Sequence, residues 1–296
     1  MAGRTPSLFF RRRRVVTGVA AGLASVLGAG VLVGCTAASG AAEDAGPERR
    51  TRAADVLLPT AGMGFDYQIG GGYRPPDGVR AVSRDREDQP AAGLYNVCYV
   101  NAFQTQPGAL AWWLDAHPDL LLRDEEGELV IDEGWDEVLL DTSTPARRTQ
   151  LTEIVGEWID GCAESGFQAV EPDNLDSFER SKGRLTEAHN AAFATALATR
   201  AHSEGLAIGQ KNTTDLLDRH TGIGFDFAVT EECAQFDECG AYAEAYDGRV
   251  FAIEYEGEGD VGFGAACSAW GERISLVLRD LDVLPAGEKG YVYRSC

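Results

Sequence analysis

Short apolar runs alternate with longer amphipathic segments from Gly64 to the end of the chain. This alternation is typical of parallel strands separated by helices. The apolar runs predict nine strands, at residues 65–69, 79–83, 93–100, 138–140, 168–170, 206–208, 225–229, 249–253 and 274–278. A closed barrel needs eight strands, so the pattern contains one more strand than a barrel requires.

Two longer segments place apolar residues at helical spacing. The first runs from Thr144 to Glu164, with Thr144 as the capping residue and Pro145 in the first turn. The second runs from Thr186 to Glu204 and is followed by Gly205, a residue that commonly ends helices. Both segments predict long helices that bury one apolar face.

Polar residues follow nearly every predicted strand, and this distribution decides between two folds. An open, doubly wound sheet binds its ligand in one crevice and usually has a glycine-rich phosphate loop ahead of an early helix. The glycines at 70–72 follow the first strand, but no helical pattern follows them. A barrel instead brings the carboxyl ends of all its strands to one face. We therefore predict an α/β fold with a single domain, a (β/α)8 TIM-like barrel over residues 55–296.

The first 34 residues have the composition of an export signal. They contain five arginines, then an apolar stretch from Val15 to Val33, and no acidic residue. The stretch is long enough for a retained membrane helix, but its Gly and Ala content favours a cleaved signal peptide over residues 1–34. Its end, Leu32-Val33-Gly34-Cys35, resembles a bacterial lipobox, so we expect lipidation at Cys35.

Residues 35–54 are rich in Ala, Gly, Ser, Pro and charge, and they show no apolar periodicity. Such a segment buries too little apolar surface to fold, so we expect a flexible tether. The arginine cluster fits both the twin-arginine and the general secretory route. We expect an exported protein that either faces outside the cytoplasm on a lipid anchor or is secreted.

Cysteine usage supports export. Besides Cys35 the chain has an even number of cysteines, which are Cys98, Cys162, Cys233, Cys239, Cys267 and Cys296. An even number in an exported chain predicts disulfides, and none of these cysteines has the paired spacing of a zinc site. Cys233 and Cys239 are near enough in sequence to close a small loop, while the pairing of the other four stays open.

Charge restricts the partners. Without the five signal arginines the chain's 26 basic residues fall to 21 against 47 acidic residues, a formal net charge of −26. Such a surface repels nucleic acid and anionic lipid, so we expect neither as a partner, and membrane contact only through the lipid anchor. Solubility alone explains many acidic surfaces. A cationic substrate is the more specific explanation, and we expect a monomer.

Carboxylates are the best candidates for catalysis. The four histidines, His117, His189, His202 and His220, all fall in helical segments, so a histidine-bound metal is not expected, and neither is a cofactor. Glycoside hydrolysis needs one carboxylic acid and one carboxylate. Asp173 follows an apolar strand within Glu171-Pro-Asp-Asn-Leu-Asp176, and Glu231 follows the strand at 225–229. A helix cap or a calcium site is the alternative for Asp173, and an ordinary loop acid is the alternative for Glu231.

Further residues at strand ends are candidates for substrate contact. Lys211 is one of three lysines, and at a barrel mouth it is expected to hold a carboxylate ionised. Tyrosines at these ends can stack on sugar rings or fill the barrel. The full candidate set is Asp66, Tyr67, Gln68, Asp85, Tyr99, Glu171, Asn174, Asp176, Lys211, Asn212, Glu254 and Tyr255.

Several separated motifs together resemble glycoside hydrolase family 114. They are Phe65-Asp-Tyr-Gln-Ile-Gly70, Val170-Glu-Pro-Asp-Asn-Leu-Asp176, Gln210-Lys-Asn212, Thr230-Glu-Glu-Cys233 with Cys239, and Phe251-Ala-Ile-Glu-Tyr255. The resemblance implies a TIM-like barrel and endo-acting cleavage of α-1,4-linked polygalactosamine-type polymers, with Asp173 and Glu231 as the catalytic acids. The run from Val79 to Asp85 and the segment 101–107 with Trp112 and Trp113 depart from the family pattern. A sugar-binding lipoprotein without catalysis is the rival hypothesis.

Overall fold

The structure is a computed structural model that describes residues 56–296, apart from the side chains of residues 258–261. The predicted signal peptide at 1–34, the lipidation site Cys35 and the tether at 35–54 therefore lie outside the described residues. In the part of the chain that is described, none of the helices combines the length and apolarity needed to cross a bilayer.

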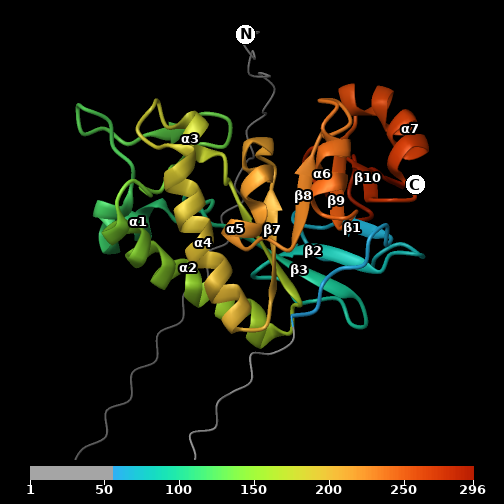
Figure 1. Ribbon diagram of the computed structural model, residues 1–296, viewed down its shortest axis with the longest axis horizontal. Helices are drawn as coiled ribbons and strands as arrows, with labels where there is room; N and C mark the ends of the chain where they lie inside the picture. The colour runs from blue at the N-terminus through green and yellow to red at the C-terminus, as the bar shows by residue number, and fades with distance from the viewer. Residues whose placement is uncertain (1–55) are drawn as a thin grey trace, which may run out of the picture. The chain divides into compact units, whose positions relative to one another are not determined.

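Eight parallel strands form the wall of a barrel (Figure 1). In the order of the sheet they are β1 (Phe65–Tyr67), β2 (Ala81–Asp85), β3 (Tyr95–Asn101), β6 (Ala169–Asp173), β7 (Ala207–Lys211), β8 (Phe227–Glu231), β9 (Val250–Tyr255) and β10 (Ser275–Arg279). Each strand pairs in parallel with the next in this order. The predicted TIM-like barrel is confirmed.

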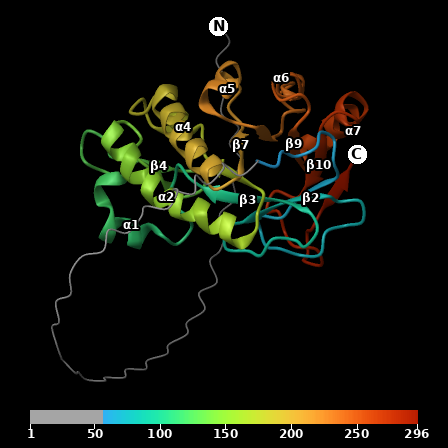
Figure 2. The same ribbon diagram turned by 60° about the horizontal axis from the view of Figure 1, so that its bottom comes forward.

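Helices cover the wall unevenly (Figure 2). The α-helices are α1 (Leu110–Ala116), α2 (Pro145–Ser165), α3 (Ser177–Arg180), α4 (Glu187–Ser203), α5 (His220–Ile223), α6 (Cys239–Ala245) and α7 (Glu258–Trp270). The short 3-10 helices are η1 (Pro118–Leu120) and η2 (Thr214–Arg219). No helix connects β1 to β2 or β2 to β3, both of which are described throughout, so loops replace the first two helices of an ideal (β/α)8 barrel.

The two predicted long helices are confirmed as α2 and α4. The Thr144 side chain accepts a hydrogen bond from the Arg147 N–H at the start of α2, and Pro145 occupies the first turn. Thr186 caps α4 and exchanges hydrogen bonds with His189 in a capping box. These side chains satisfy backbone donors that have no partner within the helix, which fixes where each helix begins.

One predicted strand is wrong as a barrel strand. Residues 138–140 lie in an insertion between β3 and β6, where β4 (Ile131–Asp132) pairs antiparallel with β5 (Glu137–Val138). Their apolar side chains are buried, but they pack beneath the inserted segment and against the helical layer rather than in the barrel wall. A short apolar run indicates burial without indicating which layer it is buried in, and this explains the ninth predicted strand.

The barrel ring is closed by side chains at one place. The pairing order starts at β1 and runs to β10, whose other edge pairs antiparallel with β11 (Tyr293–Ser295), a strand that the sequence pattern did not predict. β1 and β10 are neighbours, yet no backbone ladder joins them among the described residues. Arg279 of β10 instead forms a fully buried ion pair with Asp66 of β1, with 3.1 Å between Nη1 and Oδ1. We call this junction the β1–β10 seam.

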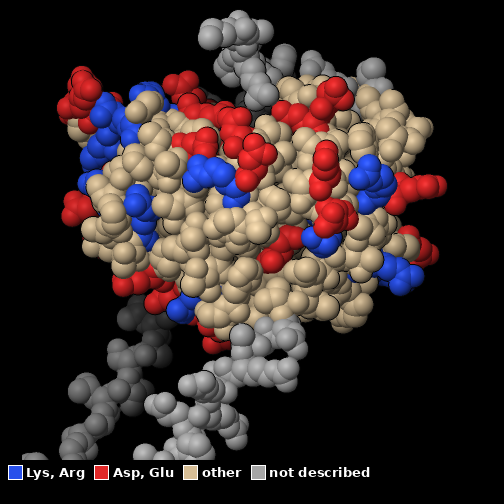
Figure 3. Space-filling view, in the orientation of Figure 1, with Lys and Arg blue, Asp and Glu red and all other residues tan. Residues whose placement is uncertain are grey.

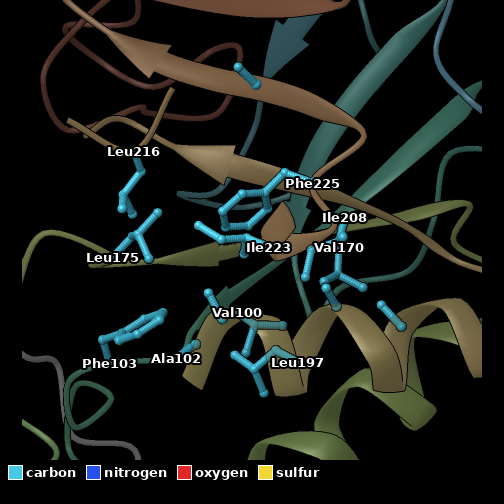
Figure 4. Packing of buried hydrophobic residues seen from close by; sticks show 14 of the residues in the cluster. Val100, Ala102, Phe103, Val170, Leu175, Leu197, Ile208, Leu216, Ile223 and Phe225 are labelled. Atoms are coloured by element: carbon cyan, nitrogen blue, oxygen red, sulfur yellow. The ribbon is translucent and has the colours of Figure 1, made fainter. Parts of the chain in front are cut away.

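Two apolar layers hold the fold together. Inside the barrel, alternate strand residues such as Phe65, Val97, Phe227 and Phe251 pack on one another. Outside it, the opposite faces of the strands pack against the helices, and Figure 4 shows Val100, Val170 and Ile208 directed towards Leu197 of α4. Burying both strand faces in this way fixes the register of the wall and points alternate side chains of the strand ends into the barrel mouth.

Three disulfides tie elements together. Cys98 of β3 is bonded to Cys162 of α2, and Cys267 of α7 is bonded to Cys296 at the end of the chain. The third disulfide, Cys233–Cys239, closes the short loop that the spacing suggested. All six cysteines downstream of Cys35 are thus paired, which fits a protein that folds in an oxidising environment.

Candidate active site

Three adjacent strands bring two acids and one lysine together at the barrel mouth. Asp173, Lys211 and Glu231 are the last residues of β6, β7 and β8, respectively. The Lys211 Nζ lies 3.1 Å from Asp173 Oδ1 and 3.5 Å from Glu231 Oε2. Because the lysine belongs to the middle strand, its ammonium lies between the two carboxylates.

This shared ammonium limits the distance between the acids. The separation of the Asp173 and Glu231 oxygens that face Lys211 cannot exceed the sum of the two distances to Nζ. Retaining glycosidases hold their carboxyl groups about 5–5.5 Å apart, and inverting enzymes hold them about 6.5–9.5 Å apart. Even a straight arrangement of the three atoms brings these two oxygens only to the lower edge of the inverting range, so the pair is compatible with the retaining spacing.

Each acid also receives a tyrosine hydroxyl on its other oxygen. Tyr99 donates to Asp173 Oδ2 at 2.7 Å, and Tyr255 donates to Glu231 Oε1. Burial first, and the nearby carboxylates second, raise the pKa of both tyrosines well above their usual value, so the hydroxyls remain protonated donors. The two acids therefore have matching surroundings, with a phenol on one oxygen and the ammonium on the other.

The protonation state of Asp173 follows from its partners. Burial alone would raise its pKa, but the Lys211 ammonium, the Tyr99 hydroxyl and the Asn174 backbone N–H outweigh burial and lower it. Burial likewise opposes the charge on Lys211, yet Asp173, Glu231 and Glu171 together raise its pKa well above the usual value. Asp173 is thus a carboxylate, and Lys211 is an ammonium, across the neutral pH range.

A buried polar floor supports the lysine. Glu171, fully buried on β6, accepts from Lys211 Nζ at 3.0 Å, from the Tyr67 hydroxyl at 2.9 Å and from the Ser83 hydroxyl at 2.7 Å. A buried carboxylate needs such partners, and here it receives a donor from each of three other strands. Ser83 was not among the residues predicted from the sequence, because a serine inside an apolar strand carries no distinguishing signal.

The residue that follows each of the strands β6, β7 and β8 has a left-handed backbone conformation. Asn174, Asn212 and Glu232 have φ values of 66°, 44° and 57°. Asparagine tolerates this conformation, whereas glutamate adopts it only under constraint. Asn212 also holds the neighbouring acid, since its Oδ1 accepts from the Glu231 N–H at 2.8 Å and its Nδ2 donates to Glu231 Oε2 at 3.1 Å.

The structure joins seven of the predicted substrate-binding residues to the two acids and places the other five elsewhere. The seven are Tyr67, Tyr99, Glu171, Asn174, Lys211, Asn212 and Tyr255. Asp66 is fully buried in the β1–β10 seam, where Gln68 donates to it. Asp176 pairs with Arg180 on α3, and Asp85 caps its own loop by accepting from the Glu87 N–H.

Glu254 lies on the opposite face of β9 from Tyr255. Its Oε1 accepts from the Ala234 N–H beneath the Cys233–Cys239 loop, and the residue is fully buried. The side chains of Glu254, Cys233 and Cys239 lie within 4.8 Å of one another, a grouping that could hold a metal ion if the thiols were free. The two sulfurs are bonded to each other, so they do not offer the thiolates that a metal needs.

The insertion between β3 and β6 adds Glu137, an acid that the sequence pattern did not single out. Asn101, at the end of β3, accepts from Asn174 Nδ2 at 2.9 Å and donates to Glu137 of β5 at 2.8 Å. Burial raises the pKa of Glu137 to about 7, while Asn101 opposes that shift. Glu137 lies far from Asp173 in sequence, and only the folded hairpin brings it near.

A separate pocket of about 590 Å³ lies away from these acids. It is lined by the loops on either side of β2, including Tyr73, Pro75, Arg84 and Ala91, and it contains none of the residues around Lys211. This pocket lies beside the loops that replace the first two helices. The electrostatic arrangement around Lys211, and not the volume of this pocket, marks the candidate active site.

Comparisons with known proteins bear on the fold and on the family. The model of glycoside-hydrolase family GH114 matches residues 46–296. Ega3 of Aspergillus fumigatus, solved in complex with galactosamine, superposes with a TM-score of 0.63 at 23% identity, covering 82% of this chain and 98% of that one. The glycoside hydrolase domain of PelA from Pseudomonas aeruginosa superposes with a TM-score of 0.51 at 17% identity, covering 76% and 96%. No curated protein sequence matches the chain. With the family model spanning the whole barrel, the chain belongs to glycoside-hydrolase family GH114.

Proposed function

We propose that this glycoside hydrolase cleaves an α-1,4-linked galactosamine-type polysaccharide, with Asp173 as the nucleophile and Glu231 as the general acid and base. The observation that carries the proposal is the Lys211 ammonium between the two carboxylates. The galactosamine bound to Ega3 supports the choice of sugar, because that protein has the same fold.

The two acids have the same kinds of side-chain donors but differ in exposure, and Asp173 also accepts from a backbone N–H, which supports the assignment of roles. Asp173 has its pKa lowered, and its side chain is 18% exposed. A carboxylate that stays ionised suits the nucleophile, which attacks the anomeric carbon while the glycosidic oxygen leaves. Glu231, with a side chain 28% exposed, is the more open of the two acids. It is in a position to give its proton to the leaving oxygen and later to take one from water.

The short separation of the acids predicts retention at the anomeric carbon. In the first step the Asp173 oxygen forms a bond to the sugar as the glycosidic bond breaks, and the Glu231 proton goes to the leaving hydroxyl. In the second step Glu231 takes a proton from water, whose oxygen replaces Asp173. Products of the same α configuration as the substrate are expected, as measured by NMR immediately after mixing.

The test is reducing-end release from a galactosamine polymer by Asp173→Asn and Glu231→Gln variants. Each variant should lose about 10²-fold or more of kcat, with a melting temperature close to that of the parent. Asp226→Asn is a matched control. Its carboxylate lies just before β8, at the other end of the same strand, and binds the Ile208 N–H, so activity should remain. Turnover by a variant that lacks both acids, or polymer binding without any cleavage by the parent chain, contradicts the proposal.

We further propose that the barrel is exported and held by a lipid on Cys35, acting as a monomer outside the cytoplasm. The three disulfides support an extracytoplasmic location. Fatty-acid labelling of the full chain in cells should give a membrane-bound labelled protein. A Cys35→Ser variant should be unlabelled, and equal labelling of both chains contradicts the anchor.

A further inference from the structure

The turn that follows β8 begins directly after Glu231 and is held in an unfavourable conformation. Glu232 has a φ of 57°, which brings the Cβ of a non-glycine residue close to its own backbone. The next residue, Cys233, is bonded to Cys239, so the disulfide closes the turn. Surrounding contacts must hold such a conformation, and these contacts also determine where Glu231 lies.

The end of β9 supplies contacts on both sides of this turn. Tyr255 faces the barrel interior and donates to the Glu231 carboxylate. Glu254, one residue earlier, faces the other side and accepts from the Ala234 N–H at 2.9 Å. The backbone carbonyl of Ile253, the residue before Glu254, accepts from the Glu232 N–H at 2.7 Å. Three consecutive residues of one strand therefore hold the catalytic side chain and the backbone that follows it.

Burying the Glu254 carboxyl group is energetically costly. The residue is fully buried, and within the described residues its Oε2 has no hydrogen-bond partner. Burial raises the pKa of Glu254 to about 7, although the backbone N–H groups of Ala234 and Gln235 oppose that shift. A carboxyl group in such a place is destabilising compared with an apolar side chain. The one thing that it provides is an acceptor for the backbone of this turn.

We propose that Glu254 is a positioning residue that fixes the turn at 232–235 and thereby the placement of the Glu231 acid. The proposal rests on the role of Glu231 given above. Glu254 touches neither reacting group, since Tyr255 and the strand lie between. Its effect on catalysis is therefore confined to the steps in which Glu231 transfers a proton.

Leaving-group dependence separates this role from a general loss of structure. A natural sugar leaving group needs protonation by Glu231, whereas an activated aryl leaving group departs without it. The substrates are a galactosamine polymer and an aryl α-glycoside of a galactosamine oligosaccharide. Because kcat/KM reports only the steps up to departure of the leaving group, we expect Glu254→Leu to lower kcat/KM about 10- to 100-fold on the polymer and by less than about 3-fold on the aryl glycoside.

Two further variants keep the test decisive if Glu254→Leu does not fold. Glu254→Gln keeps a carbonyl oxygen for the Ala234 N–H and should lie within about 3-fold of the parent on both substrates. Glu254→Asp keeps the charge but withdraws the oxygen by one methylene, and it should show the same selective loss as Glu254→Leu. A loss of equal size on both substrates, or no loss in Glu254→Asp, overturns the proposal.

The control for position is Asp132→Asn. Asp132 is also a buried acid near the barrel mouth, but it pairs with Arg180 in the insertion. Its substitution should leave the ratio of the two activities unchanged, and a change in that ratio overturns the proposal. If the parent chain cleaves the polymer while Glu254 variants keep the parent ratio, only the positioning role fails. If the parent chain does not cleave it, the proposed function fails first.

Discussion

Asp173 and Glu231 each place one oxygen against Lys211 and the other against a tyrosine hydroxyl, and they differ in how exposed they are. Four of the residues that hold them, Tyr99, Lys211, Asn212 and Tyr255, are among the last three residues of strands or follow them directly. The sequence could predict these residues because polar side chains at the ends of apolar strands are conspicuous. It could not predict the direction of each side chain, and Glu254 next to Tyr255 shows why. Neighbouring strand residues face opposite ways, so a one-residue difference moves a carboxylate from the mouth to the outer layer.

Removal of the Tyr99 hydroxyl should move the acid limb of the pH profile. The hydroxyl stabilises the ionised form of Asp173, so its loss in Tyr99→Phe raises the pKa of that carboxyl. The acidic limb of kcat/KM should shift upward by about one pH unit. Tyr95→Phe is the matched control, because Tyr95 faces the same way at the other end of β3 and donates to the Leu57 carbonyl. An unchanged acid limb in Tyr99→Phe contradicts the assignment of Asp173.

Glu137 should make the fold less stable as the pH rises. Its pKa is raised to about 7 in the fold, whereas an exposed glutamate has a pKa near 4.5, so the folded state holds its proton more tightly. The stabilisation is complete below the unfolded pKa and is lost as the pH rises through about 7. Glu137→Gln keeps an acceptor for Asn101 and should be more stable than the parent at pH 8, by about 1–2 kcal/mol, but not at pH 4. Thermal unfolding at pH 4 and pH 8 measures this difference in stability, and substitution of the exposed Glu126 by Gln is the control. A stability difference of equal size at both pH values contradicts the prediction.

At the scale of elements, helix starts could be predicted from the capping side chains. The layer of the fold in which an apolar run is buried could not. Thr144, Pro145 and Thr186 mark helix starts by their own side chains, and α2 and α4 begin where these residues predict. The strand ends were predicted too short, because Glu171, Asp173 and Lys211 are polar although they continue β6 and β7. The seven-residue α1 and α6 were missed, since helices of two turns lack a readable period. The loops that replace helices around β2 leave no apolar signal either.

The three disulfides should rank differently for stability and for activity. Loop-closure entropy predicts stabilisation of about 4 kcal/mol for Cys98–Cys162, about 3–4 for Cys267–Cys296 and about 2 for Cys233–Cys239, which span 64, 29 and 6 positions. Paired Cys→Ser variants should therefore lower the melting temperature in that order. Polymer cleavage should suffer most from the shortest loop, because that loop holds the turn after Glu231. If activity follows the melting temperature in all three variants, the link between this loop and Glu231 is contradicted.

For the molecule as a whole, charge governs encounter with the substrate. The chain carries 47 acidic against 26 basic residues, and Figure 3 shows Asp and Glu side chains gathered along the upper edge of the view, the side on which α3 and α7 lie in Figure 1. α3 follows the carboxyl end of β6, where Asp173 and Asp176 lie, so acidic groups stand at the rim of the barrel mouth. A negative rim attracts the ammonium groups of a de-acetylated polymer over about 10 Å at moderate salt.

Salt should consequently weaken the use of a cationic polymer. Between about 0.05 and 0.5 M NaCl, kcat/KM on de-acetylated polymer should fall several-fold, whereas kcat/KM on the N-acetylated polymer should stay nearly constant. The neutral polymer is the control for any direct effect of salt on the enzyme. An equal salt dependence on both polymers contradicts electrostatic selection of the substrate.

The β1–β10 seam is where we expect the barrel wall to open most easily. Backbone amides along a ladder exchange with solvent only when the ladder opens, and at the seam side chains replace the ladder. Deuterium should therefore enter β1 before it enters the inner strands, as followed by amide exchange and mass spectrometry. In the order of the ring β6 and β7 lie across from the seam. The barrel wall can thus open locally at the seam while β6 and β7, which carry Asp173 and Lys211, keep their conformation.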